Sequence, residues 1–204
     1  MSSDFATTAA PEAHHGHGDP VQALKRARIG ISFFILADLM LLLAFVLSQV
    51  YLKALNTDHA FLPAGLHPPS ALFGFVVVIL GALGALAMAP NLRSGDLSAA
   101  RTRSGAVLGL VLFAAGLILE IYQVSTFGFG AGAGAYASCL YMLSGLAVFH
   151  LGTAALGSLM VTGRAGGGRL SGVRARAGIE FATWWAIWAA VAGLIIWAIA
   201  SFVV

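Results

Sequence analysis

Four ionisable side chains lie inside, or at the edge of, long apolar stretches of this 204-residue chain, and these are the positions where chemistry is expected. They are Asp38, Glu120, His150 and Glu180. An ionisable group costs several kcal/mol in hydrocarbon unless it finds a partner or water. Each of the four should therefore face other protein atoms. Its position in an apolar stretch then has to be explained by a bound proton, a charged partner or a hydrogen bond.

Asp38 is the most deeply placed of the acids. It lies roughly 14 Å along a helix that starts at Ile29, at about 1.5 Å per residue. Its neighbours in the segment ILADLMLLLAF include no cation. We expect Asp38 to face the interior of a helical bundle, with a role in proton supply or in contact with a partner. A purely structural hydrogen bond is the alternative.

The next two positions favour structural roles. Glu120 and Gln123 are one helical turn apart on the same face, which favours a structural hydrogen bond for the acid. His150 is the single histidine of an uncharged run over residues 135–161. A low-spin membrane haem usually takes two axial side chains, and the other apolar runs contain no histidine. We therefore expect a hydrogen-bonded histidine at a helix contact rather than a haem ligand.

Glu180 stands at the start of the last apolar run, with Trp184 and Trp188 four and eight residues further on. This spacing puts the carboxylate and two indoles on one helix face. Tryptophan is enriched at membrane interfaces. Together with Trp185, these residues predict a contact with lipid or with another subunit.

The elements that must position these residues are membrane helices. The chain is 59% hydrophobic and only 9% charged, with a mean hydropathy of +0.91, which is far from the composition of a soluble domain. Five runs are long enough to cross a hydrocarbon core, at residues 29–52, 70–89, 105–125, 135–161 and 179–204. The sequence predicts an all-α polytopic membrane protein with one five-helix transmembrane domain over residues 29–204.

Charge alternates between the connecting loops. All but one of the 11 Lys and Arg residues lie on the amino-terminal tail, the second loop or the fourth loop, and the exception is Lys53. The positive-inside rule then predicts a cytoplasmic amino terminus and an outside carboxyl terminus. The same placement explains the sequence pI of about 9.4 without nucleic acid as a partner.

Residues 1–28 are polar and are expected to form a flexible cytoplasmic tail. The tail carries a cluster of three histidines, His14, His15 and His17, which we expect to be solvated rather than to form a metal site.

Small residues gather on one side of the fourth run. They are Gly145, Gly152, Thr153 and Gly157, and they favour a close approach by a neighbouring helix. The single cysteine, Cys139, is expected to have a packing role.

Several short motifs, in the right order, resemble subunit III of the haem–copper oxidases. Asp38 and the apolar run after it are similar to a family segment that usually carries Glu, and Gly145 with His150 resembles a Gly-x-His-x-x-His helix in which Ala147 stands at the first histidine. Gly134, Tyr136 and Ser138 resemble the family's Gly-x-Tyr-x-Ser motif. Glu120 and Gln123 resemble its Gln-x-x-Glu pair with the two residues exchanged. Four residues of the last run resemble the family's last helix, namely Glu180, Ala182, Trp184 and Trp185. In that helix the family's following His and Asp are replaced by Ile187 and Ala190. The likeness covers about residues 29–203 and is to the five-span form.

The resemblance implies a non-redox subunit of an oxygen-reducing, proton-translocating cytochrome c oxidase type of complex in a bacterial plasma (inner) membrane. It implies packing against catalytic subunit I and subunit II, which would hold the haem and copper, while this chain would carry no cofactor or catalytic centre of its own. It also implies that Asp38 lies near a proton-uptake route and that phospholipid is bound between helices. The alternatives are an accessory subunit of a nitric oxide reductase or of a quinol oxidase, or a small ion-coupled transporter, although the expected internal repeat is missing from the sequence.

Overall fold

Five long α-helices make up most of the described chain. The structure is a computed structural model, and it describes residues 19–203 apart from 57–60, 63–64, 66 and 93–97. The helices are α1 (Pro20–Ala54), α2 (Ala71–Met88), α3 (Ala99–Ser125), α4 (Ala135–Gly166) and α5 (Val173–Phe202), with short 3-10 turns η1 (Ala89–Leu92) and η2 (Ala131–Ala133). No strand occurs among these residues, and all five helices are long and apolar enough to span a membrane. The predicted all-α, five-span fold is confirmed.

Several helices extend beyond the predicted spans at the end of the bundle that carries the basic residues. The first begins at Pro20 rather than Ile29, because Asp19 caps it by accepting a 3.0 Å hydrogen bond from the Val21 amide and proline suits the first helical turn. Residues 20–28, which were predicted as tail, are thus helical. Residues 1–18 of the predicted tail, including the three histidines, lie outside the described residues.

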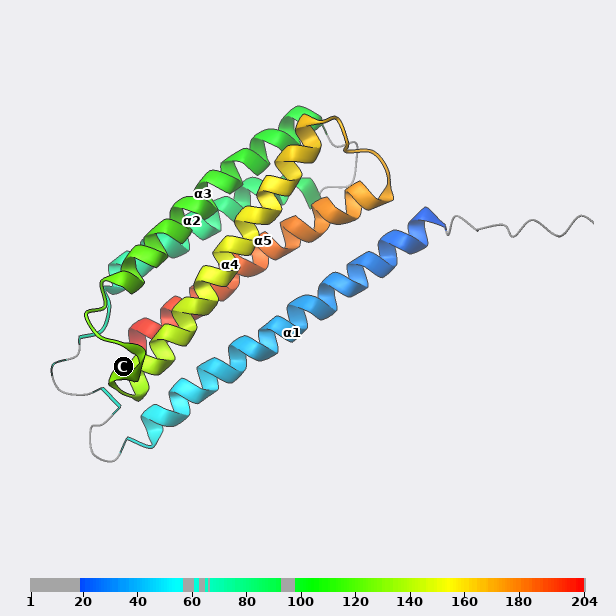
Figure 1. The fold of residues 1–204 in the computed structure, drawn as a ribbon. Coiled ribbons are helices and arrows are strands. Elements are labelled where there is room, and N and C mark those ends of the chain that lie inside the picture. Colours follow the sequence, from blue (N-terminus) through cyan, green and yellow to red (C-terminus); the bar gives the residue numbers. More distant parts are fainter. Residues whose placement is uncertain (1–18, 57–60, 63–64, 66, 93–97, 204) are drawn as a thin grey trace, which may run out of the picture.

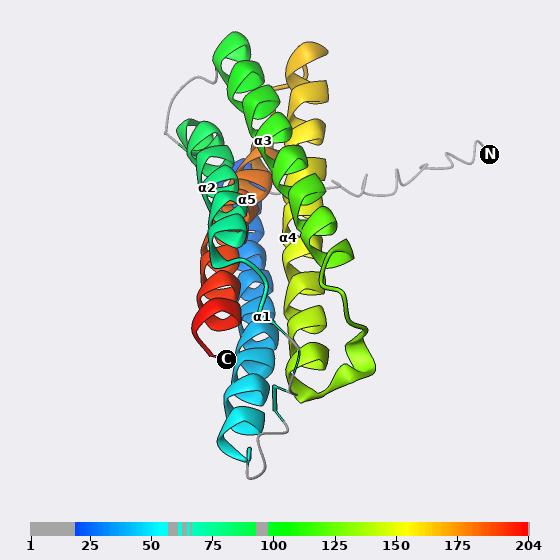
Figure 2. The same ribbon diagram turned by 90° about the vertical axis from the view of Figure 1, so that its left-hand side faces the viewer.

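Four of the helices form a closed ring, and the fifth lies against its outside. In the ring α2 packs on α3, α3 on α4, α4 on α5, and α5 on α2, while α1 contacts α4 and α5. Figure 1 shows α1 along one edge of the molecule, apart from α2 and α3, and Figure 2 shows it between α4 and α5. This arrangement leaves α1 with much of its surface outside the bundle.

Small residues allow the ring helices to approach closely. A Cβ atom at Gly105 of α3 would lie 2.5 Å from the carbonyl oxygen of Ala87, and one at Gly157 of α4 would lie 3.3 Å from the Ala182 Cβ. The expected close contact at Gly157 is therefore confirmed. Gly145 is different, because it is exposed and an added Cβ would meet nothing within 4 Å. Cys139 is buried, as its packing role requires.

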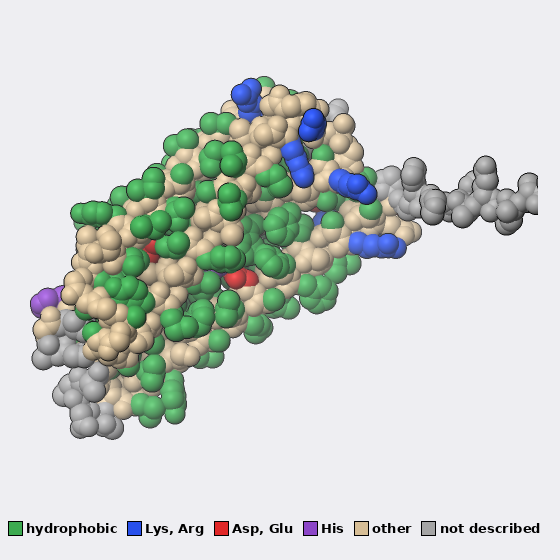
Figure 3. Space-filling model, viewed as in Figure 1, with side chains coloured by type: hydrophobic (Ala, Val, Ile, Leu, Met, Phe, Trp, Pro, Cys, Tyr) green, Lys and Arg blue, Asp and Glu red, His purple; other side chains and the backbone are tan. Residues whose placement is uncertain are grey.

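The basic side chains gather at one end of the bundle. Figure 3 shows them around the start of α1 and the neighbouring helix ends, and Lys53 lies in the last turn of α1 at the other end. The loops on these two ends therefore differ in charge as the sequence predicts. The sidedness inferred from this difference remains a prediction.

Candidate functional site

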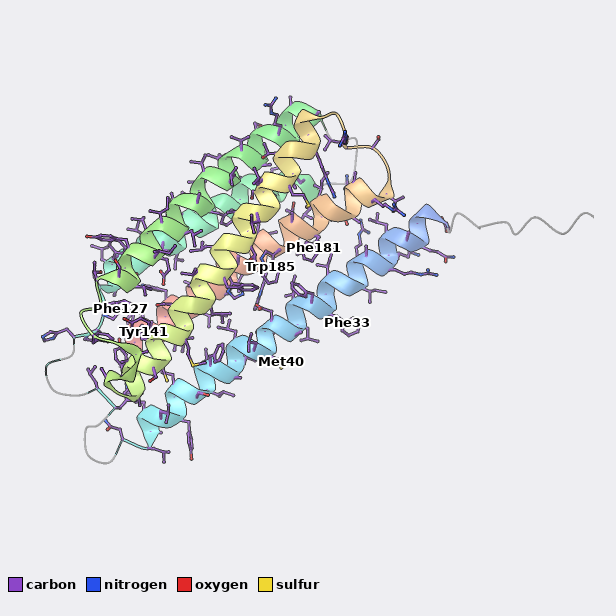
Figure 4. All side chains as sticks on the ribbon, viewed as in Figure 1. Phe33, Met40, Phe127, Tyr141, Phe181 and Trp185 are labelled. Atoms are coloured by element: carbon purple, nitrogen blue, oxygen red, sulfur yellow. The ribbon has the colours of Figure 1, made fainter. Side chains whose placement is uncertain are left out.

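α1 is attached to the bundle along a narrow face. Only four of its described residues are buried, namely Ile31, Asp38, Leu42 and Gln49. They are seven, four and seven residues apart, so they share one side of the helix. Figure 4 shows Phe33 and Met40 on the side of α1 that points away from the bundle, and both are more than half exposed. An apolar helix thus turns its one membrane acid inward.

Asp38 is the point where three helices meet. His150 Nε2 of α4 lies 2.6 Å from Asp38 Oδ2, and the indole Nε1–H of Trp188 on α5 donates to the same oxygen at 2.6 Å. The exposed fraction is 9% for Asp38 and 1% for His150. Indole can only donate, so this oxygen must accept from Trp188 whatever the position of the proton between Asp38 and His150. The expected inward direction of Asp38 and the hydrogen-bonded role of His150 are confirmed.

Aromatic rings hold the imidazole in place. The Trp185 and His150 rings are tilted by 30° with centroids 5.6 Å apart, and Trp185 Nε1–H donates to Thr153 Oγ1 at 2.7 Å. This packing fixes the orientation of the imidazole beside Asp38. Its second ring nitrogen, Nδ1, is buried and has no hydrogen-bond partner in the described structure.

Glu120 lies on α3 and lines a small slot inside the bundle. Its side chain is buried, with Ser144 of α4 beside it as a hydrogen-bond partner. Its structural role remains a prediction. Gln123 lines the same slot, as expected for a residue one turn away. The slot has a volume of about 50 Å³, and its lining also includes His150.

Glu180 belongs to a separate polar cluster at the basic end. Arg28 of α1 binds its carboxylate with two hydrogen bonds, from Nε at 2.9 Å and from a terminal nitrogen at 3.0 Å, and Arg176 Nε donates at 2.9 Å. Such two-point pairing fixes the geometry as well as the charge. Glu180 therefore ties the start of α5 to the start of α1.

The tryptophans of α5 divide between the surface and the interior. Trp184 is 44% exposed, and its lipid or subunit contact remains a prediction. Trp185 and Trp188 differ from the expectation, because both are buried and contact His150 and Asp38 instead. Glu180 is also buried, against its two arginines. The exposed indole of Trp184 and the buried indole of Trp188 are only one helical turn apart, because α1 covers only part of α5.

Sequence reasoning missed three of the residues that organise this region. Gln49 is fully buried, and its amide donates to the carbonyl of Val203 at 3.0 Å. The sequence places Arg28 in the predicted tail and gives no signal for Ser144. One signal was present for Gln49, because it follows Asp38 by three helical turns and so shares its face. Arg28 and Ser144 contact residues of other helices, and such contacts leave no pattern in the neighbouring sequence.

The fold and the site together define a polytopic α-helical membrane protein with a buried acid–histidine pair. No protein-family model matches the chain, and no curated protein matches it. Among the described residues, no group of three or more His, Cys, Asp and Glu side chains is arranged to hold a metal ion.

Proposed function

We propose that this chain is a non-redox subunit, of the subunit III type, in a haem–copper terminal oxidase of a bacterial plasma membrane. In this role it stabilises the catalytic subunit and supports proton uptake and lipid binding during oxygen reduction. One observation carries the proposal. Asp38 and His150, which carry the resemblance in two separate motifs, lie in direct contact at 2.6 Å.

The Asp38–His150 pair suits a subunit that supports proton supply. A carboxylate and an imidazole at hydrogen-bond distance can share and exchange a proton, and an ionisable pair inside a membrane is most often functional. Trp188 stabilises the carboxylate form with its N–H group. The pair lies on the inner side of α1, which is the helix with the most exposed apolar surface, and we assign the contact with the catalytic subunit to that surface.

A groove between α1 and α5 supports the lipid part of the proposal. It has a volume of about 590 Å³, and Arg28, Glu180 and Trp184 lie at its basic end. Its walls continue along α1 as Ile31, Ile35, Leu36 and Leu39. A phospholipid placed here would put its phosphate beside the half-exposed guanidinium of Arg28 and an acyl chain along the apolar wall.

The proposal is tested by purifying the tagged chain from its native membrane and identifying the chains, haems and copper that accompany it. We expect catalytic subunit I and subunit II with stoichiometric haem and copper, and the electron donor then identifies a cytochrome c or a quinol oxidase. A nitric oxide reductase as the partner, or a chain that purifies alone and moves ions, would contradict the proposal.

A matched pair of variants tests the surface assigned to the contact. Met40→Trp enlarges an exposed residue of α1, and Leu86→Trp enlarges an exposed residue of α2. We expect Met40→Trp to reduce the recovery of the catalytic subunit and Leu86→Trp to leave it unchanged. The reverse result would move the contact surface to α2.

A further inference from the structure

The slot beside His150 extends from the middle of the bundle to one of its ends. It lies among α2, α3, α4 and α5, and its lining includes Ala189 near the middle of α5 and Ser201 near the end of that helix. These two residues are separated by roughly 18 Å of helix. Ser70, which is exposed at the start of α2, also lines it. This end is opposite to the end that carries the Arg28–Glu180 cluster.

Four polar side chains from α3 and α4 line this slot, in addition to the two serines near its end. Glu120 and Gln123 come from α3, and Ser144 and His150 come from α4. His150 Nδ1 is the decisive atom, because it is fully buried and has no partner among the described residues. A buried ring nitrogen without a hydrogen bond is unfavourable, and water held in a cavity beside it can make that bond. About 10–15 Å³ of space open to the centre of a water molecule is enough for one water, so the slot, with about 50 Å³ of such space, has room for more than one ordered water.

We propose that the slot is a water site that connects Glu120 to His150 Nδ1 and gives the Asp38–His150 pair proton access from the end of the bundle where α5 ends. This inference goes beyond the proposed function and does not depend on it, because it requires no partner subunit. The ligand is water together with the proton that water carries. The site lies entirely within this chain.

The two ring nitrogens of His150 define the direction of proton transfer through the site. A proton that arrives from the slot water binds to Nδ1 and makes the imidazole a cation. The proton on Nε2 can then pass to Asp38 Oδ2, 2.6 Å away, which leaves a neutral imidazole beside a protonated carboxyl group. One proton has entered at Nδ1 and one has reached Asp38, so the charge balances.

The groups around the pair favour this transfer. Asp38 faces the imidazole from α1, Trp185 and Trp188 face it from α5, and Glu120 faces the slot from α3. The residues that α2 contributes to the slot are Ser70, Gly74, Val77, Val78 and Gly81, and none of them carries a charge. The imidazole thus lies between two acids, and none of these surrounding residues is a lysine or an arginine.

The test is the contact between water and His150 in the full chain, labelled with ¹⁵N-histidine and embedded in lipid bilayers. Water-edited solid-state NMR spectroscopy transfers magnetisation from water to nearby nitrogen atoms, and the His150 signal is assigned by its loss in His150→Asn. We expect transfer to Nδ1 of His150 in the unmodified chain. The absence of magnetisation transfer from water to His150 would overturn the proposal.

Two glycines provide a matched obstruction and control. Gly193 lines the slot and Gly145 faces outward, and an added Cβ meets nothing within 4 Å at either position. We expect Gly193→Leu to abolish the transfer and Gly145→Leu to preserve it. Gly193→Ala, with one added methyl group, should weaken it if the leucine variant does not fold. Equal transfer in all variants, or equal loss in both leucine variants, would overturn the proposal.

The role of Glu120 is tested by a second pair of variants. Glu120→Gln keeps the shape of the side chain and removes its charge from the slot, and we expect it to shift the His150 ring signals. Arg169→Gln removes an exposed charge at the opposite end and should leave them unchanged. Unaltered signals in Glu120→Gln would break the proposed link from Glu120 to His150. None of these measurements involves an oxidase partner, so their failure and the failure of the proposed function are distinct results.

Discussion

Asp38 shows how a single membrane acid is accommodated. Both His150 and Trp188 contact the same carboxylate oxygen at 2.6 Å. Removing one member of a buried pair leaves the other without compensation, and this costs more than the pair contributes when intact. The local structure is therefore expected to depend on a side chain at position 38 that can still accept hydrogen bonds.

The first prediction at this scale is for Asp38→Asn. The amide oxygen can still accept from Trp188 and His150, so assembly and haem content should be preserved. The variant cannot hold a proton, and oxygen consumption by the complex should fall most at high pH, where protons are scarce. The measurement is oxygen consumption across pH at equal haem content.

Asp38→Glu is the matched control, because it retains the acid and should retain the alkaline activity. Parallel pH profiles for the unmodified complex and for Asp38→Asn would remove the proton role and leave only a structural hydrogen bond. Loss of haem in Asp38→Asn would mean that the acid is needed for assembly.

At the scale of elements, α1 depends on polar contacts at three levels. Arg28 pairs with Glu180 at one end, Asp38 contacts His150 and Trp188 in the middle, and Gln49 donates to the last turn of α5. Between these levels much of α1 is exposed. Polar contacts stabilise helix association inside a membrane because hydrocarbon offers no alternative partner. The ring helices depend instead on close packing of small residues.

The prediction at this scale concerns the contact of α4 with α5. Gly157→Leu places a branched side chain where a Cβ alone would already be 3.3 Å from the Ala182 Cβ. The helices must then separate, and overpacking of this kind typically costs about 1–3 kcal/mol. We expect a lower thermal transition of the purified chain and a poorer recovery of the complex. Gly145→Leu, on the outward side of the same helix, should change neither, and equal stability of the two variants would place Gly157 outside the contact.

At the scale of the whole molecule, charge defines two ends. The basic residues flank the start of α1, the start of α3 and the junction of α4 with α5. Arginine and lysine in short loops are retained on the cytoplasmic side during insertion. The end with Arg28 and Glu180 is therefore expected to be cytoplasmic, and the slot beside His150 is expected to open toward the outside.

The corresponding prediction uses single cysteines in a Cys139→Ser chain. Both Gly130 and Gly167 are exposed, and they lie at opposite ends of α4. Gly130→Cys should react with an impermeant thiol reagent added to intact cells, and Gly167→Cys should react only after the cells are opened. The opposite pattern would invert the topology.

The amino-acid sequence by itself determined the five membrane helices and the depth of the acids. Backbone groups in hydrocarbon must be satisfied within the segment, so long apolar runs can only be helices. Asp38 had to face inward for the same reason, because hydrocarbon does not solvate a carboxylate. The extra turns at the basic end were not predicted, since a hydropathy pattern marks the membrane and not the ends of a helix.

Only the tertiary structure decided which residues meet. Asp38 is 112 residues from His150 and 150 residues from Trp188, and Arg28 is 152 residues from Glu180. Helical periodicity gives the face of a residue but not the neighbouring helix, and many pairings would bury the same small and polar groups. The order of the ring and the place of α1 outside it selected these contacts. They also left a slot lined by His150 and Glu120, because four helices that pack through unequal side chains cannot fill every gap between them.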